Sequence, residues 1–156
     1  DYMSSEKSLK EIDFLLSSVA KTRQNILISL HPKQKLDRYI FLEGKYECKI
    51  VSERLSYIMP IADVFISASS SVSIWAVMCG IKTITMNFYD LAIYGAKDLY
   101  SVKLVKDKSL FVNSINELLK KEVDFTSDWK ELSRDEVFDK GVIKRYLEII
   151  NELGKN

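Results

Sequence analysis

The chain has 156 residues, 47% of them hydrophobic, which suffices for one domain with a substantial core. Its 23 basic and 22 acidic residues give a formal net charge of +1, which argues against a nucleic-acid-binding module, because such modules carry a clear basic excess. No run approaches the roughly 18 apolar residues of a membrane-spanning helix, the opening at Asp1 is too polar for a signal peptide, and the missing initiator methionine suggests a piece of a longer protein.

Strand-like and helix-like patterns alternate along the chain. In the first part of the chain, apolar spacing and turn residues predict a capped amphipathic helix through Leu9–Val19, a continuously buried strand at 25–30, a short helix at 33–41, a strand at 47–51 and a short helix at 55–59 that Pro60 ends. Strands at 64–66 and 83–86 follow, with a helix at 74–79 between them. The last predicted elements are a strand at 102–105 and helices at 110–119 and 141–153. The charged stretch 121–136 is expected to be irregular. This alternation predicts an α/β fold, a Rossmann-like three-layer parallel sheet of about five or six strands with helices on both faces. Its core would span 25–120, with C-terminal helices at 128–153.

The most informative segment is a predicted β-α-β unit between Ala62 and Met86. Three consecutive serines, Ser69 to Ser71, stand between its first strand and its helix, and Gly80 stands where a helix C-cap belongs. Open α/β sheets bind ligands at the carboxyl ends of their strands, and a helix N-terminus at such a place suits a phosphate. The alternative is that the serines only cap the helix, a role in which serine is common.

The second candidate element is the turn that follows the strand at 25–30. His31 is the sole histidine of the chain, Pro32 comes directly after it, and Lys33 and Lys35 add positive charge. Parallel strands open on one edge of a sheet, so this turn and the serine turn are expected to face one cleft, about 10 Å apart across one intervening strand. The alternative is a histidine with a purely structural role.

Other common sites are not indicated. The five glycines form neither a GxGxxG fingerprint nor a P-loop, so a classical dinucleotide fold is not expected. Cys48 and Cys79 lack the spacing of a zinc site and are expected to be buried free thiols of a reducing compartment.

Several short motifs together resemble the C-terminal half of GT-B-type enzymes, over about residues 25–120. They are His31-Pro32, Tyr39, Ala62-Asp63, Ser70-Ser71-Val72 and Gly80-Ile81-Lys82-Thr83-Ile84. The pattern is most similar to bacterial surface-polysaccharide transferases, which include capsule and sialic-acid transferases and the CDP-glycerol-dependent teichoic-acid polymerases. More distantly it resembles the UDP-N-acetylglucosamine 2-epimerases, which share the architecture.

The resemblance implies roles for individual residues. His31 would contact the donor phosphate and act in catalysis by stabilising the leaving group. The other implied nucleotide- and phosphate-binding residues are Pro32, Lys33, Ser69, Ser70, Ser71 and Val72. Asp90 and Tyr94 match an Asp-and-Tyr loop that would contact the donor sugar, with aromatic packing under a surface turn as the alternative. No metal site is implied.

One position departs from the family pattern. Epimerases and many GT-B transferases place a carboxylate about four residues into the helix, where it holds the ribose hydroxyls, and that position is Trp75 here. No acidic residue stands between Asp63 and Asp90, so the ribose would be held differently or the nucleotide would not be UDP. Trp75 itself is expected either in the core or on a packing surface for a second domain.

The resemblance therefore implies the nucleotide-sugar-binding domain of a glycosyltransferase in bacterial surface polysaccharide biosynthesis, of capsule or lipopolysaccharide, in the cytoplasm or at the inner face of the membrane. It implies a CMP-, CDP- or UDP-linked sugar as donor, no cofactor, and an N-terminal acceptor domain as partner, without which this domain would be inactive. Two alternatives remain open: half of a UDP-N-acetylglucosamine 2-epimerase-like enzyme, or a non-catalytic α/β interaction module. A receiver-like module would need clustered acids at its strand ends, whereas Asp63 stands at a strand start.

Overall fold

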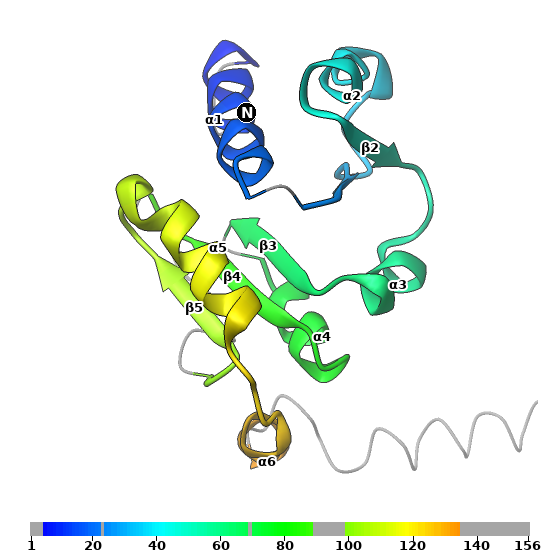
Figure 1. Ribbon diagram of the computed structural model, residues 1–156. Coiled ribbons are helices and arrows are strands. Elements are labelled where there is room, and N and C mark those ends of the chain that lie inside the picture. Colours follow the sequence, from blue (N-terminus) through cyan, green and yellow to red (C-terminus); the bar gives the residue numbers. More distant parts are fainter. Residues whose placement is uncertain (1–4, 23, 69, 89–98, 135–156) are drawn as a thin grey trace, which may run out of the picture.

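A computed structural model describes residues 5–22, 24–68, 70–88 and 99–134 (Figure 1). Its elements, in chain order, are α1 (Ser5–Ala20), β1 (Ile26–Ser29), η1 (Leu36–Arg38), α2 (Phe41–Tyr46), β2 (Cys48–Val51), α3 (Leu55–Ile58), η2 (Met59–Ile61), β3 (Val64–Ala68), α4 (Val72–Met78), β4 (Lys82–Met86), β5 (Val102–Val105), η4 (Lys108–Leu110), α5 (Phe111–Lys120) and α6 (Thr126–Arg134). The predicted alternation of strands and helices is confirmed over these ranges. The helix expected at 141–153 lies outside the described residues.

The strands form two parallel sheets instead of the single larger sheet that the sequence predicts. β1 pairs with β2, and β3, β4 and β5 pair in that order. In the described part of the chain, β1 and β3 each have one hydrogen-bonded neighbour, so each keeps one open edge. The α/β class with parallel strands is confirmed, but the described strands number five and are divided between two sheets.

Helix α1 joins the two sheets through different side chains. Leu16 and Ile12 belong to the cluster of β1, β2 and α2, whereas Phe14, Leu15 and Val19 pack against the cluster of β3, β4, β5 and α5. In Figure 1, α1 stands beside α2 above the larger sheet. The two sheets therefore share one apolar helix even though their strands do not pair.

The larger sheet carries the main core. Phe111, Ile115 and Leu118 of α5 lie at spacings that place them on one helix face, and they pack on Ile84 and Val105 of the sheet. Two rings extend this packing, since Phe14 and Phe88 each lie about 6 Å from the Phe111 ring, at 6.2 and 6.0 Å. The core thus links α1, α5 and the sheet.

Helix α4 packs through Ile74 and Val77 and ends as its sequence predicts. Gly80 has φ +73°, and its N–H bonds the Val77 carbonyl at 3.0 Å, while the Ile81 N–H bonds the Ala76 carbonyl at 2.9 Å. This left-handed turn is open to glycine at little cost, which explains why the helix stops there.

Two local predictions are wrong in their boundaries. The helix expected at 33–41 is the single turn η1 followed by α2, because Tyr39 alone of its apolar residues is buried, while Leu36 and Ile40 are 46% and 47% exposed. The stretch 121–136, expected to be irregular, contains α6. Its charges conceal a helical spacing of apolar residues, Phe125, Trp129 and Leu132, of which Leu132 is buried.

Three predictions of burial are also corrected. Strand β1 alternates in exposure, and Leu27 is 46% exposed, because the cluster with α1 and α2 covers only the face of Ile26 and Ile28. Cys48 is buried as expected, but Cys79 is exposed just beyond α4. Trp75 is 61% exposed, which excludes the core position and leaves the packing-surface alternative as a prediction.

No helix in the described ranges is long and apolar enough to cross a membrane.

Candidate functional site

The His31 turn is a compact structure held by its own hydrogen bonds. The His31 N–H donates to Gln34 Oε1 at 2.8 Å, and the Gln34 N–H returns a bond to the His31 carbonyl at 2.7 Å. Gln34 Nε2 also bonds the hydroxyl of Tyr39 at 3.1 Å. Because Tyr39 is buried among the residues of α2 and β2, it anchors the turn at the carboxyl end of β1.

One of these bonds orients the imidazole. The backbone N–H of Lys33 donates to His31 Nδ1 at 3.2 Å. A ring nitrogen that accepts a hydrogen bond carries no proton, so the neutral ring holds its proton on Nε2. His31, Pro32 and Lys33 are all exposed, and the turn thus offers an Nε2–H donor beside a lysine.

The serine turn is held in the same local way. Ser70 Oγ accepts the Val72 N–H at 3.3 Å, and the Ser73 N–H donates to the Ser70 carbonyl at 3.1 Å. The hydroxyls of Ser67 and Ser73 bond each other at 3.0 Å, which joins β3 to the first turn of α4. The hydroxyls of Ser70 and Ser73 are therefore engaged in local hydrogen bonds.

Ser71 behaves differently. It occupies the N-cap position of α4, is exposed, and makes no side-chain capping bond. Its hydroxyl is thus not used in the way that a simple helix cap would use it. Ser69, Asp90 and Tyr94 lie outside the described residues.

The two turns follow two different strands. His31 comes two residues after the end of β1, and Ser70 comes two residues after the end of β3. The hydrogen bonds of each turn stay within that turn or reach its own flanking elements, and β1 and β3 belong to different sheets. A common cleft for His31 and Ser70 therefore stays a prediction. Within the described ranges, no three His, Cys, Asp or Glu side chains gather as a metal site would require.

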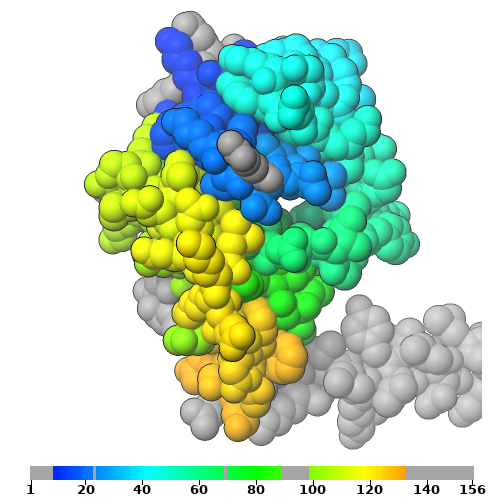
Figure 2. Space-filling view, in the orientation of Figure 1, coloured from blue at the N-terminus to red at the C-terminus, as the bar shows by residue number. Residues whose placement is uncertain are grey.

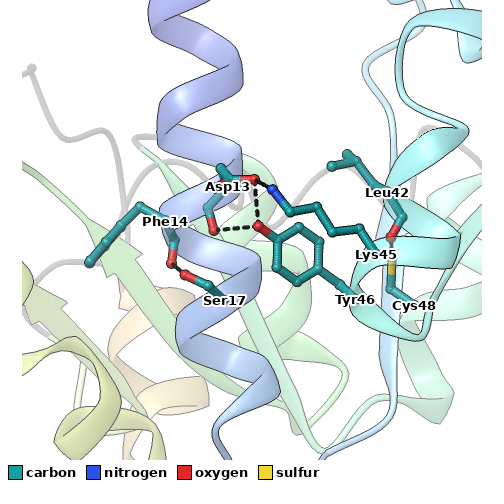
Figure 3. A network of polar contacts seen from close by, with 7 residues as sticks. All are labelled: Asp13, Phe14, Ser17, Leu42, Lys45, Tyr46 and Cys48. Atoms are coloured by element: carbon teal, nitrogen blue, oxygen red, sulfur yellow. Dashed lines mark hydrogen bonds and ion pairs between the residues drawn. The ribbon is translucent and has the colours of Figure 1, made fainter.

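Two polar networks were not found from the sequence. In the first, drawn in Figure 3, Asp13 of α1 accepts hydrogen bonds from Lys45 Nζ at 2.5 Å and from the hydroxyl of Tyr46, so α1 is tied to α2. These bonds, that of Lys45 first, lower the pKa of the Asp13 carboxyl, and the bond to Asp13 raises the pKa of Lys45. Burial, followed by the bond to Asp13, raises the pKa of Tyr46. An acidic residue between Ile12 and Phe14 of an amphipathic helix is the signal that could have indicated it.

The second network lies under the turn before β5. Asp128 of α6 is buried and accepts the N–H groups of Tyr100 and Ser101, at 2.6 and 2.8 Å. Trp129 of the same helix donates its indole N–H to the Val77 carbonyl of α4 at 3.0 Å. These contacts have the geometry of structural anchors, because each joins a side chain of α6 to a backbone group, of the turn before β5 for Asp128 and of α4 for Trp129.

A groove of about 390 Å³ lies elsewhere, between β5 and α5. An ion pair of 3.2 Å between Lys103 and Glu117, both among its lining residues, crosses from strand to helix. None of the predicted site residues lines this groove. Comparisons with models of known protein families, with curated proteins and with solved structures found no match to this chain.

Proposed function

We propose that this domain binds the phosphate of a nucleotide-sugar donor at the carboxyl ends of β1 and β3, as part of a glycosyltransferase that builds a bacterial surface polysaccharide. The observation that supports the proposal is the strand pairing. β1 pairs with β2, and β3, β4 and β5 pair in that order. These pairings are compatible with the doubly wound order 2-1-3-4-5, which would also need β1 beside β3, a pairing that the described residues do not show. In that order β2 is added on one side of β1, whereas β4 and β5 are added on the opposite side, beyond β3. Ligands bind outside the carboxyl ends of β1 and β3, where the order reverses.

The two turns that the motifs indicate follow these same two strands. The His31 turn would supply the Nε2–H donor and the cation of Lys33, and the serine turn would supply the exposed hydroxyl of Ser71. Hydrogen bonds of this kind stabilise negative charge as it develops on a departing phosphate. His31 would therefore act as the catalytic group of this half of the enzyme. The general base would come from the N-terminal acceptor domain that the resemblance implies.

Nucleotide titration followed by NMR tests the proposal. We expect CMP and CDP to shift the resonances of His31 and Ser71 more than UMP and UDP do, since the surface-polysaccharide transferases that the motifs resemble use cytidine-linked donors. Affinity should be no tighter than the high micromolar range, because one half of a cleft cannot bury its ligand.

Matched variants separate binding from stability. His31→Ala should weaken CDP binding by about tenfold or more, the effect of losing one charge-assisted hydrogen bond of about 1.5–3 kcal/mol, without lowering the melting temperature. Ser71→Ala should also weaken binding, whereas Ser56→Ala, an exposed serine on α3, should not. If no nucleotide shifts either turn, the nucleotide-binding function is wrong and the interaction-module alternative takes its place.

A further inference from the structure

The segment between the His31 turn and α2 exposes apolar and basic side chains together. Leu36, Ile40 and Phe41 are 46%, 47% and 52% exposed. Lys33, Lys35 and Arg38 alternate with them and are exposed as well, with Asp37 as the single acid. Residues 33–41, here called the basic–apolar turn, thus carry a net charge of +2 while the whole chain carries +1.

One short turn of backbone carries these side chains. The Ile40 N–H bonds the Leu36 carbonyl at 3.0 Å, a helical contact that places these two apolar side chains one above the other. The Arg38 N–H bonds the Lys35 carbonyl at 3.2 Å across the same turn, η1. Two exposed aliphatic side chains and two exposed cations therefore share one turn.

The inner side of the turn is attached to the rest of the domain. Tyr39 is buried and bonds Gln34, so the turn has a fixed inner side and a free outer surface. In Figure 2 the part of the chain that includes α2, coloured cyan, forms a protrusion at the upper right of the molecule. None of the exposed apolar residues of the turn lines the groove between β5 and α5.

We infer that the basic–apolar turn docks on an anionic membrane surface. Surface-bound segments insert Leu, Ile and Phe side chains at the boundary between headgroups and acyl chains, while Lys and Arg bind the lipid phosphates beside them. A nucleic acid would use the cations but would leave the exposed aliphatic side chains in water. Lys33 is shared with the proposed phosphate site, whereas Leu36, Ile40 and Phe41 are not part of that site, so variants of these apolar residues test membrane docking separately from nucleotide binding.

Sedimentation of the whole 156-residue chain with lipid vesicles tests the inference. The probes are vesicles of equal parts phosphatidylglycerol and phosphatidylcholine, and vesicles of phosphatidylcholine alone. We expect binding to the anionic vesicles that weakens as salt is added, and little binding to the neutral ones. Equal binding to both, or binding to single-stranded RNA with none to anionic vesicles, would overturn it.

Variants of the apolar and the basic side chains of the turn test whether this surface contacts the membrane. Ile40→Ser and Phe41→Ser should each weaken vesicle binding by roughly threefold to tenfold, the effect of a half-exposed apolar side chain that no longer enters the lipid. Ile61→Ser is the matched control, because Ile61 is 70% exposed on η2 and lies outside the turn. Lys35→Ala should weaken binding about fivefold, and Lys106→Ala, an exposed lysine after β5, should not.

Folding and the nucleotide site are controlled separately. Ile40 is the N-cap of α2, where serine is favoured, so Ile40→Ser should keep its melting temperature. Its nucleotide-induced NMR shifts should also be unchanged, whereas His31→Ala should bind vesicles as the parent chain does. An equal loss of vesicle binding in Ile40→Ser and Ile61→Ser would overturn the assignment to this turn.

Discussion

The backbone N–H of Lys33 donates a hydrogen bond of 3.2 Å to Nδ1 of His31. Proline at the intervening position has no N–H of its own and a fixed φ, so it holds Lys33 in place for this contact. The bond gives the imidazole one tautomer and one orientation.

This relationship predicts the protonation pattern of the ring. In its neutral form, the histidine should carry its proton on Nε2, because Nδ1 is the acceptor. Imidazole ¹⁵N chemical shifts measure this directly, and His31 is the sole histidine of the chain, so the signals need no further assignment. Replacement of Pro32 by Ala should loosen the turn and bring the two nitrogen shifts closer to those of a free, mixed-tautomer imidazole. A proton found on Nδ1 in the parent chain would contradict the hydrogen bond.

The contact between α1 and α2 should make stability depend on pH. The pKa of Asp13 is lowered in the folded chain, chiefly by the bond from Lys45, relative to the ordinary 3.8. The contribution of the Asp13 carboxylate to the stability of the fold is therefore fully present above pH 3.8 and is lost as the pH falls through the lower, folded-state pKa. Asp13→Asn should melt a few degrees below the parent chain at neutral pH, and the difference should shrink in acid.

The same network gives a prediction at alkaline pH. The pKa of Lys45 is raised, first by its bond to Asp13. The contribution of Lys45 to the stability of the fold is therefore present below the ordinary pKa of 10.5 and is lost as the pH rises through the folded-state pKa.

Tyr46→Phe should cost about 0.5–1.5 kcal/mol of stability at neutral pH, measured by urea unfolding, because it removes one hydrogen bond to Asp13. A pH-independent difference between Asp13→Asn and the parent chain would contradict the proposed coupling.

The two cysteines should differ sharply in reactivity. Cys79 is exposed, whereas Cys48 is buried, bonds the Leu42 carbonyl at 3.3 Å, and has a pKa raised by burial. A thiol reagent such as Ellman's should therefore label one thiol per chain quickly and the second only on unfolding. Cys79→Ser should abolish the fast phase and Cys48→Ser should leave it unchanged. Two thiols of equal reactivity in the folded chain would contradict this.

Asp128 should be among the polar residues most important for stability. Asp128→Ala would leave the buried N–H of Ser101 and the partly buried N–H of Tyr100 without their acceptor. The expected loss is about 2–4 kcal/mol in the free energy of unfolding, since each abandoned buried donor costs about 1–3 kcal/mol. Urea unfolding measures it. Asp124→Ala is the control, because Asp124 accepts an exposed hydrogen bond from the Thr126 N–H at the start of α6, and its loss should be clearly smaller.

Local patterns in the sequence were enough to predict several of the helices and strands. β2, β4, β5, α1 and α5 lie close to their predicted ranges, because their apolar spacing and their boundaries can be read from neighbouring residues. The same holds for the end of α4, where Gly80 takes the left-handed conformation that few other residues accept. The position of the His31 and serine turns after two strands also follows from local pattern.

Tertiary structure decided which surfaces are covered and which strands pair. Apolar composition suggested a buried 25–30 strand and a buried thiol at Cys79, but burial depends on which helix packs above a residue, and α1 and α2 cover only one face of β1. The irregular stretch expected at 121–136 contains α6, whose anchors, Asp128 to Tyr100 and Trp129 to Val77, join residues 28 and 52 positions apart. The division of the strands into two sheets is likewise a matter of long-range pairing, which no local pattern specifies.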